Sequence, residues 1–204
     1  MLAVDILQGV SVIVAALVAL YGVTAWRREY VGKKQLELAE EVLALFYEAR
    51  DAVAFIRSPV GYVGEGSSRQ AAPNETPEEK SINDNAYVVF ERYGKRQELF
   101  NKLHAMRYRY LARFGKDSAK PFNDLDAIVR EILASGRTLA LYWKEQGVRQ
   151  WTSQEEFRRH LDAMTKQEAV FWDMGPDKDK ITPRIDAAVA GIEAQASKVI
   201  GKFK

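Results

Sequence analysis

The sequence predicts an all-α protein in which an N-terminal transmembrane helix precedes an antiparallel cytosolic bundle of about five helices. Three observations carry this prediction: an uncharged apolar run at residues 6–26, apolar positions at helical spacing in the rest of the chain, and no stretch that alternates persistently enough for a strand. We expect residues 1–30 to form the membrane anchor and its boundary. Residues 31–204 then form the cytosolic bundle, with a long loop at 58–76.

The composition narrows the chemistry that this chain can perform. The net charge of +2 in 204 residues gives no overall electrostatic reason for nucleic-acid binding, which we do not expect. The absence of cysteine excludes disulfides, thiol nucleophiles and cysteine-ligated metals. Because only two histidines are present, little remains for a histidine-rich metal site. We therefore expect neither a metal nor a cofactor.

The predicted anchor is the segment "ILQGVSVIVAALVALYGVTAW", residues 6–26, which contains no charged side chain. As a helix of 21 residues it would be about 31 Å long, which matches a hydrocarbon core of roughly 30 Å. Tyr21 and Trp26 lie near its C-terminal end, where aromatic side chains favour the headgroup region. Two alternatives stay open at this point: a cleaved signal peptide and a buried core helix.

Basic residues follow the run directly and define the expected membrane boundary. No lysine or arginine precedes the run, whereas only Glu29 offsets the basic residues after it. By the positive-inside rule, this asymmetry predicts a single pass with the N-terminus outside and the C-terminal domain in the cytosol. The lipid bilayer is thus the first expected partner. The predicted boundary residues are Trp26, Arg27, Arg28, Lys33 and Lys34.

Five amphipathic helices are predicted after the anchor. The first follows it almost without interruption and ends before Ser58-Pro59. The second runs from residue 76 or 81 to 114, where Gly115 ends it. The third begins near Pro121, the fourth after residue 153 and the fifth near Pro183. Since the connections between them are short, we expect antiparallel neighbours in a bundle.

Two helix starts have the sequence pattern of a capping box, in which a hydroxyl and an acidic side chain three residues later satisfy each other's backbone N–H groups. Thr76 and Glu79 form one such pattern, with Pro77 at the first helical position. Ser153 and Glu156 form the other. We expect both helices to begin at these residues.

The loop "SPVGYVGEGSSRQ", residues 58–70, is the predicted location of any ligand site. Its glycines permit backbone conformations that expose amide groups to an anion, and its hydroxyl and guanidinium groups add donors. No Lys-Ser/Thr pair follows as in a P-loop, and no strand precedes the loop as in a dinucleotide fingerprint. The alternative is a flexible connection between two long helices. The candidate ligand-binding residues are Gly61, Gly64, Gly66, Ser67, Ser68 and Arg69.

A second segment, "HAMRYRYLARFGK" at residues 104–116, places arginines among aromatic side chains. Such a mixture binds phosphates or stacks on bases in some proteins, but cations near a helix C-terminus also complement the helix dipole. We expect anionic lipid contact here only if this end of the helix approaches the membrane.

Three further side chains have two interpretations each. Arg96 and Arg107 fall on an apolar stripe, so either they point outward or acidic residues such as Glu40, Glu41 or Glu48 pair with them. His160 lies one helical turn after Glu156, a spacing that suits a metal ligand pair but more commonly an exposed ion pair.

The stretch "LAEEVLALFYEARDAVAFIRSPVGYVGEGSSR", residues 38–69, resembles uncharacterised bacterial single-pass membrane proteins with a helical cytosolic domain. The similarity extends to "PRIDAAVAGIEA", residues 183–194. The resemblance implies a bacterial inner membrane. These proteins have no established activity, so no catalytic residue is carried over.

Taken together, these features favour a membrane-anchored helical interaction or scaffold protein. Its coiled-coil-like stripes would bind a protein partner or a second copy of the chain. The alternative is a membrane-tethered enzyme or an anionic-ligand-binding protein that uses the loop at residues 58–70. A third hypothesis places the bundle outside the cytosol, but the basic residues after the span argue against it.

Overall fold

A computed structural model of the chain describes residues 2–201, with side chains described at residue 9 and from residue 11 onward. These residues form six α-helices and one short 3-10 helix, with no strand among them, so the predicted all-α class is confirmed. The elements are α1 (Leu2–Arg57), α2 (Pro77–Lys95), α3 (Gln97–Phe114), η1 (Lys116–Ala119), α4 (Lys120–Val148), α5 (Gln154–Phe171) and α6 (Thr182–Ile200).

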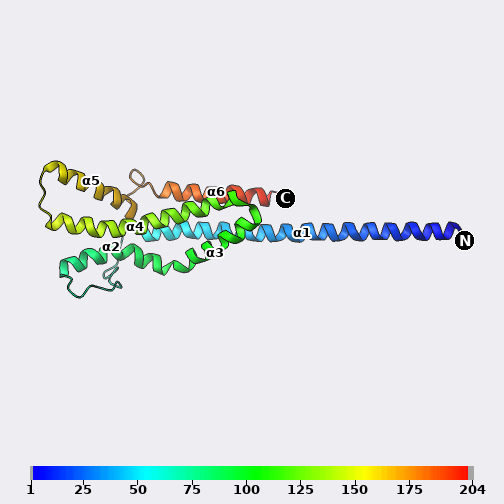
Figure 1. Ribbon diagram of the computed structural model, residues 1–204, viewed down its shortest axis with the longest axis horizontal. Coiled ribbons are helices and arrows are strands. Elements are labelled where there is room, and N and C mark those ends of the chain that lie inside the picture. The colour runs from blue at the N-terminus through cyan, green and yellow to red at the C-terminus, as the bar shows by residue number, and fades with distance from the viewer. Residues whose placement is uncertain (1, 202–204) are drawn as a thin grey trace.

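The longest element, α1, joins the predicted anchor to the bundle without a break. Its 56 residues make a helix about 84 Å long. No proline interrupts it, and it ends immediately before Ser58-Pro59, because proline disfavours helical geometry in the preceding residue. The N-terminal half of α1 projects alone from the molecule, and the C-terminal half lies among the other helices (Figure 1). The near-continuous path predicted from the sequence is therefore present.

The C-terminal half of α1 is the central element of the core. It packs against α6, α3 and α2. Its buried side chains follow the four-three spacing predicted for the first helix after the anchor. The residues at this spacing are Leu38, Val42, Leu45, Ala49, Ala52 and Ile56, and Phe46 and Val53 are buried beside them.

The single helix expected between residues 76 and 114 is two helices. The chain leaves helical geometry at Arg96, which has φ −116° and ψ 7° and separates α2 from α3. Gly94 just before the break lowers helix propensity at this point. The break allows α2 to pack mainly against α4 while α3 packs mainly against α1. The prediction of one helix was wrong because the apolar residues of α2 and α3 follow the same helical spacing. This spacing gives no sign of the bend between the two helices.

Of the two predicted capping boxes, one is complete. Thr76 accepts a hydrogen bond from the Glu79 N–H, and the Glu79 carboxylate accepts one from the Thr76 N–H. At α5, Ser153 accepts from the Glu156 N–H. The Glu156 carboxylate instead accepts from the Thr152 N–H and from Arg149, so this second box is only half formed.

The helix α4 connects the parts of the bundle, because it packs against α2, α5 and α6. Gly136 permits the close approach of α2. A Cβ atom at this position would lie 2.9 Å from the Ala86 carbonyl oxygen and 3.0 Å from the Phe90 ring. In the ribbon diagram α6 returns beside α1, so the described C-terminal end lies near the point where α1 leaves the bundle (Figure 1).

Candidate functional sites

The first feature of functional interest is the isolated half of α1. The described side chains from 11 to 30 are all exposed, and most of them are apolar. One helix of the described chain is long and apolar enough to cross a membrane, and the apolar window that qualifies it is not buried at all. This segment is consequently not a core helix of the bundle, which removes one of the two alternatives left open by the sequence.

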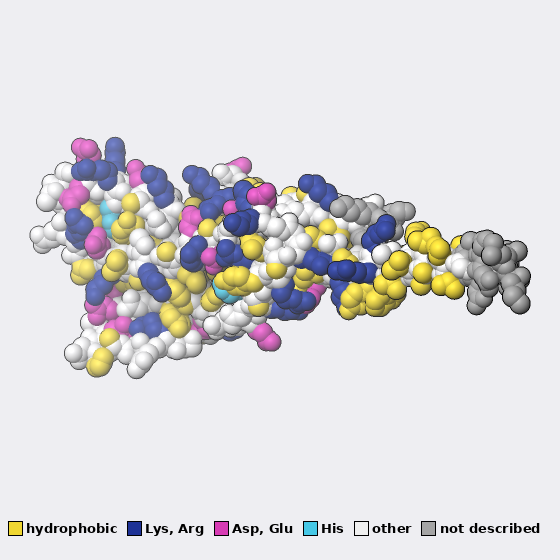
Figure 2. All heavy atoms as spheres, turned by 45° about the vertical axis from the view of Figure 1, so that its right-hand side comes forward, with side chains coloured by type: hydrophobic (Ala, Val, Ile, Leu, Met, Phe, Trp, Pro, Cys, Tyr) yellow, Lys and Arg dark blue, Asp and Glu magenta, His cyan; other side chains and the backbone are white. Residues whose placement is uncertain are grey.

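The predicted boundary residues lie where α1 enters the bundle. Trp26 stacks on Tyr30 with their ring centroids 5.7 Å apart. Arg27, Arg28 and Lys33 are exposed. Lys34, also exposed, forms an ion pair with Glu37 at 2.7 Å. The first buried residue of α1 after this point is Gly32. Lys and Arg side chains gather around this narrowing of the molecule (Figure 2).

In the glycine-containing loop, an internal carboxylate occupies the donors that were predicted for an external anion. Glu91 of α2 accepts a hydrogen bond from the Gly66 N–H at 2.9 Å and one from the Ser68 hydroxyl at 2.7 Å. The hydrogen bond from Ser68 lowers the pKa of Glu91 to about 2, helped by Lys95 and the Gly66 N–H and opposed by partial burial. The Ser67 hydroxyl donates within the loop, to the Gly64 carbonyl.

The charge of Arg69 is also neutralised within the loop. Its guanidinium pairs with Glu75 at 2.6 Å and with Asp84 at 2.9 Å. Gly64 and Gly66 both have positive φ, and Gly66 packs directly on α2. Gly61 lies next to the Glu65 carboxylate. This geometry favours the connector interpretation, with a folded rather than a flexible loop, and a ligand site here stays a prediction.

A buried arginine, Arg92, fixes the first part of the loop to the bundle. Its side chain is 1% exposed, and it holds the Glu65 carboxylate through two hydrogen bonds of 2.7 Å each. The same guanidinium donates to the carbonyls of Ser58 and Val60. The hydrogen bonds from Arg92 lower the pKa of Glu65 against the opposing effect of burial.

A second buried arginine, Arg57, closes the other side of the same region. Its guanidinium pairs with Asp179 at 2.9 Å, and it donates to the carbonyls of Ala169, Val170 and Trp172 at the end of α5. Burial alone would raise the pKa of Asp179. Hydrogen bonds from Arg57, Thr182 and the Ile181 N–H outweigh that effect and lower it to about 2. Arg57 thus joins the end of α1 to the α5–α6 connection.

Sequence reasoning missed both buried arginines. Arg57 had the appearance of an ordinary cation in the last turn of a helix. Arg92 follows Val89 by three positions, the spacing of residues on one helix face. This spacing was the signal that would have predicted the burial of Arg92. The two arginines that the sequence placed on an apolar stripe are Arg96 and Arg107. Arg96 is exposed, and Arg107 is half-buried with its Nε atom buried and unpaired. Neither pairs with the expected glutamates; Glu41 pairs with Lys102.

The anchored loop presents an apolar tip to the outside. Val60, Tyr62 and Val63 have exposed fractions of 75%, 78% and 108%. The residues that flank this tip are fixed, because Arg92 binds the Ser58 and Val60 carbonyls and Glu65 accepts from the Tyr62 N–H. The buried Arg92–Glu65 ion pair therefore fixes a loop whose three large apolar side chains are exposed to water.

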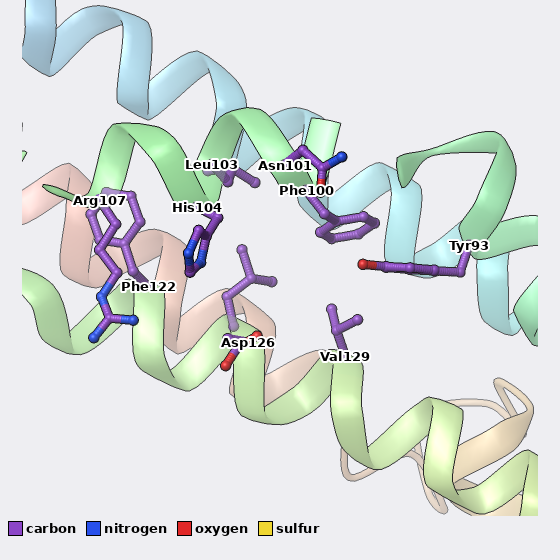
Figure 3. Close-up of a pocket in the computed structure, with 10 residues that line it drawn as sticks. Tyr93, Phe100, Asn101, Leu103, His104, Arg107, Phe122, Asp126 and Val129 are labelled. Carbon is purple, nitrogen blue, oxygen red and sulfur yellow. The ribbon is translucent and has the colours of Figure 1, made fainter. Parts of the chain in front are cut away.

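A small cavity of about 160 Å³ lies between α3 and α4. Tyr93 and Phe100 lie at one end of it, Arg107 and Phe122 at the other, and His104 lies between them (Figure 3). Drug-sized ligands occupy pockets of roughly 300–1,000 Å³, so this cavity is too small for most of them. His104 makes no hydrogen bond or ion pair with another described residue; its ring packs edge-on against Tyr108.

The predicted Glu156–His160 pair does not form. His160 is buried in contact with the rings of Tyr142 and Trp151, and its Nδ1 atom lies 3.9 Å from Glu145. Glu156 pairs with Arg149 instead. Among the described residues, no group of three or more acidic or histidine side chains is arranged to hold a metal ion.

Comparison with protein-family models, with curated proteins and with solved structures finds no match to this chain.

Proposed function

We propose that this protein is a single-pass membrane protein of the bacterial inner membrane whose cytosolic helical bundle binds a protein partner. The exposed apolar half of α1 supports the membrane anchor, since nothing in the bundle covers it. The basic residues at its C-terminal end support an orientation with the N-terminus outside. In this arrangement, the bundle acts as an interaction or scaffold module rather than an enzyme.

The continuity of α1 sets the position of the bundle relative to the bilayer. From Trp26 to Arg57 the helix runs without a break, a distance of about 47 Å. The loop that follows Arg57 therefore begins about 47 Å from the predicted membrane boundary. A rigid helix of this length would hold a partner at a defined distance from the membrane surface.

The observation that carries the partner-binding role is the apolar tip formed by Val60, Tyr62 and Val63. Tyrosine is enriched among the residues that dominate protein interfaces. Fixing such a loop in advance reduces the entropy lost on binding. Arg92 supplies that fixation here, through Glu65 and the Val60 carbonyl.

Site-specific photocrosslinking tests this role in intact cells. A photoreactive amino acid in place of Tyr62 should give a discrete crosslinked product. The same amino acid in place of Tyr108, an exposed tyrosine on α3, is the matched control and should not. The product should disappear when Val60 and Val63 are changed to serine. The mass of the product separates a different protein from a second copy of this chain. Equal crosslinking at both positions would contradict the proposed site.

A further inference from the structure

The end of the bundle that faces the predicted membrane is built from α3, η1 and α6 together with α1. The C-terminus of α3 reaches α1 there, because Arg113 donates a hydrogen bond to the Val31 carbonyl at 2.9 Å. The C-terminal turn of α6 packs beside it, where Ala196 and Val199 contact Ala39 of α1. If α1 spans the membrane, the C-terminal end of the arginine-rich segment at residues 104–116 therefore lies close to the bilayer. Such proximity is what contact with anionic lipid requires.

The distance along α1 places this end at the outer edge of the headgroup layer. Val31 follows Trp26 by five residues, which is about 7.5 Å along a helix. The polar layer on each side of a bilayer is about 5–7 Å thick. A guanidinium bound to the Val31 carbonyl therefore lies at the outer edge of that layer, within reach of lipid phosphates.

Basic side chains dominate this end. Arg113, Lys116 and Lys198 are all exposed, and none of them is in an ion pair with a described residue. Lys198 borders the same surface hollow as Asp117 and Ser118 of η1, which places it beside the α3–η1 turn. The acidic residues nearby are fewer: Glu29 and Asp117 are exposed, and Glu37 is paired with Lys34.

We propose that this end of the bundle binds the headgroups of anionic phospholipids through Arg113, Lys116 and Lys198, which extend the basic boundary of α1 into a wider surface. The bundle then sits directly on the bilayer, and α1 is oriented by lipid contacts as well as by its own span. This inference rests on the proposed single-pass anchoring. Each basic group close to an anionic surface gives roughly a fivefold preference, so contact by even one of the three favours anionic over zwitterionic lipid several-fold.

The test measures lipid selectivity next to this surface, with the full chain in liposomes of mixed anionic phosphatidylglycerol and zwitterionic phosphatidylcholine. Because the chain has no cysteine, a single Ala112→Cys change allows a fluorophore to be attached beside Arg113. Quenching by spin-labelled phosphatidylglycerol is compared with quenching by spin-labelled phosphatidylcholine. We expect anionic lipid to be enriched several-fold at the fluorophore, and the enrichment to fall as salt rises.

Two triple variants make the test specific. Arg113→Gln with Lys116→Gln and Lys198→Gln should reduce the enrichment at least several-fold. Arg158→Gln with Arg159→Gln and Lys166→Gln removes the same charge from exposed positions on α5 and should leave the enrichment unchanged. Equal effects of the two variants, or no enrichment in the unaltered chain, would overturn the inference. Flotation of each sample at alkaline pH separates this failure from failure of the anchor, because a chain that does not span the bilayer is released.

Discussion

Removal of the Arg92 cation should destabilise the bundle more than any ordinary surface change. In an Arg92→Met variant the Glu65 carboxylate, whose side chain is 5% exposed, loses its counter-charge. The carbonyls of Ser58 and Val60 lose their donor as well. Breaking one half of a buried ion pair typically costs about 3–5 kcal/mol, and the close packing of this site places the expected loss in that range. Lysine at this position would recover only part of it, since one ammonium cannot replace a bidentate guanidinium.

The assay is urea denaturation of the full chain in detergent, followed by far-ultraviolet circular dichroism. A double variant, Arg92→Met with Glu65→Gln, should recover about 2 kcal/mol or more of the loss, because no unpaired buried charge remains. Arg137→Met is the control. That arginine is exposed, lies over the Phe90 ring and is in no ion pair with a described residue, so its loss should change the free energy of unfolding by about 0.5 kcal/mol or less. A loss below about 1 kcal/mol for Arg92→Met, or a double variant no better than the single one, would refute the reasoning.

Three other outcomes follow from the same structure. Gly66→Ala should cost about 3 kcal/mol or more, because the new Cβ would lie 1.9 Å from the Asp84 carbonyl oxygen. Gly64→Ala should cost only about 1 kcal/mol, because at φ +83° its Cβ would meet only the Ser67 Oγ, at an ordinary 3.9 Å. Equal costs in urea denaturation would contradict this loop packing. If the loop at residues 58–70 binds an anionic ligand, Gly64→Ala should also abolish an anion-dependent phenotype at normal expression. An unchanged phenotype would contradict that alternative function. The lowered pKa of Asp179, about 2 against an ordinary 3.8, contributes about 2 kcal/mol of stability that is present above pH 4 and lost as the pH falls toward 2. The stability gap between the unaltered chain and Asp179→Asn should therefore narrow over that range, and a constant gap would contradict the assignment. A truncated chain that begins at Val31 should be soluble and should give a helical circular-dichroism spectrum, because the buried core begins after this residue. A spectrum of coil or strand would contradict a bundle that folds without the anchor.

The sequence predicted the helices of this protein well because helix formation has local causes. Pro59, Gly115 and the Thr76–Glu79 capping box act within a few residues of the boundary that they set. The apolar stripe of α1 identified the core face for the same reason. The α2–α3 bend was missed because it depends on where two different neighbours, α4 and α1, lie in space.

The candidate site was harder to predict because its contacts join distant parts of the chain. Nothing near Gly66 or Ser68 in the sequence indicates that Glu91 fills the loop. Arg57 and Asp179 are separated by more than half of the chain, and Asp179 lies in a segment with two other aspartates that look equivalent. Residue type indicates that a buried arginine needs an acidic partner, but only the fold selects which one.

The most direct test of the anchored arrangement is cysteine accessibility along α1 in intact cells. The chain has no cysteine, so single changes at Ala3, Ala15 and Lys34 can each be probed with a maleimide that does not cross membranes. A single-pass anchor with its N-terminus outside predicts labelling at residue 3 in intact cells, labelling at residue 34 only after the membrane is opened, and none at residue 15 in either case. Labelling at residue 15 in both conditions would show that this part of α1 meets water, and it would contradict the anchor on which the proposed function depends.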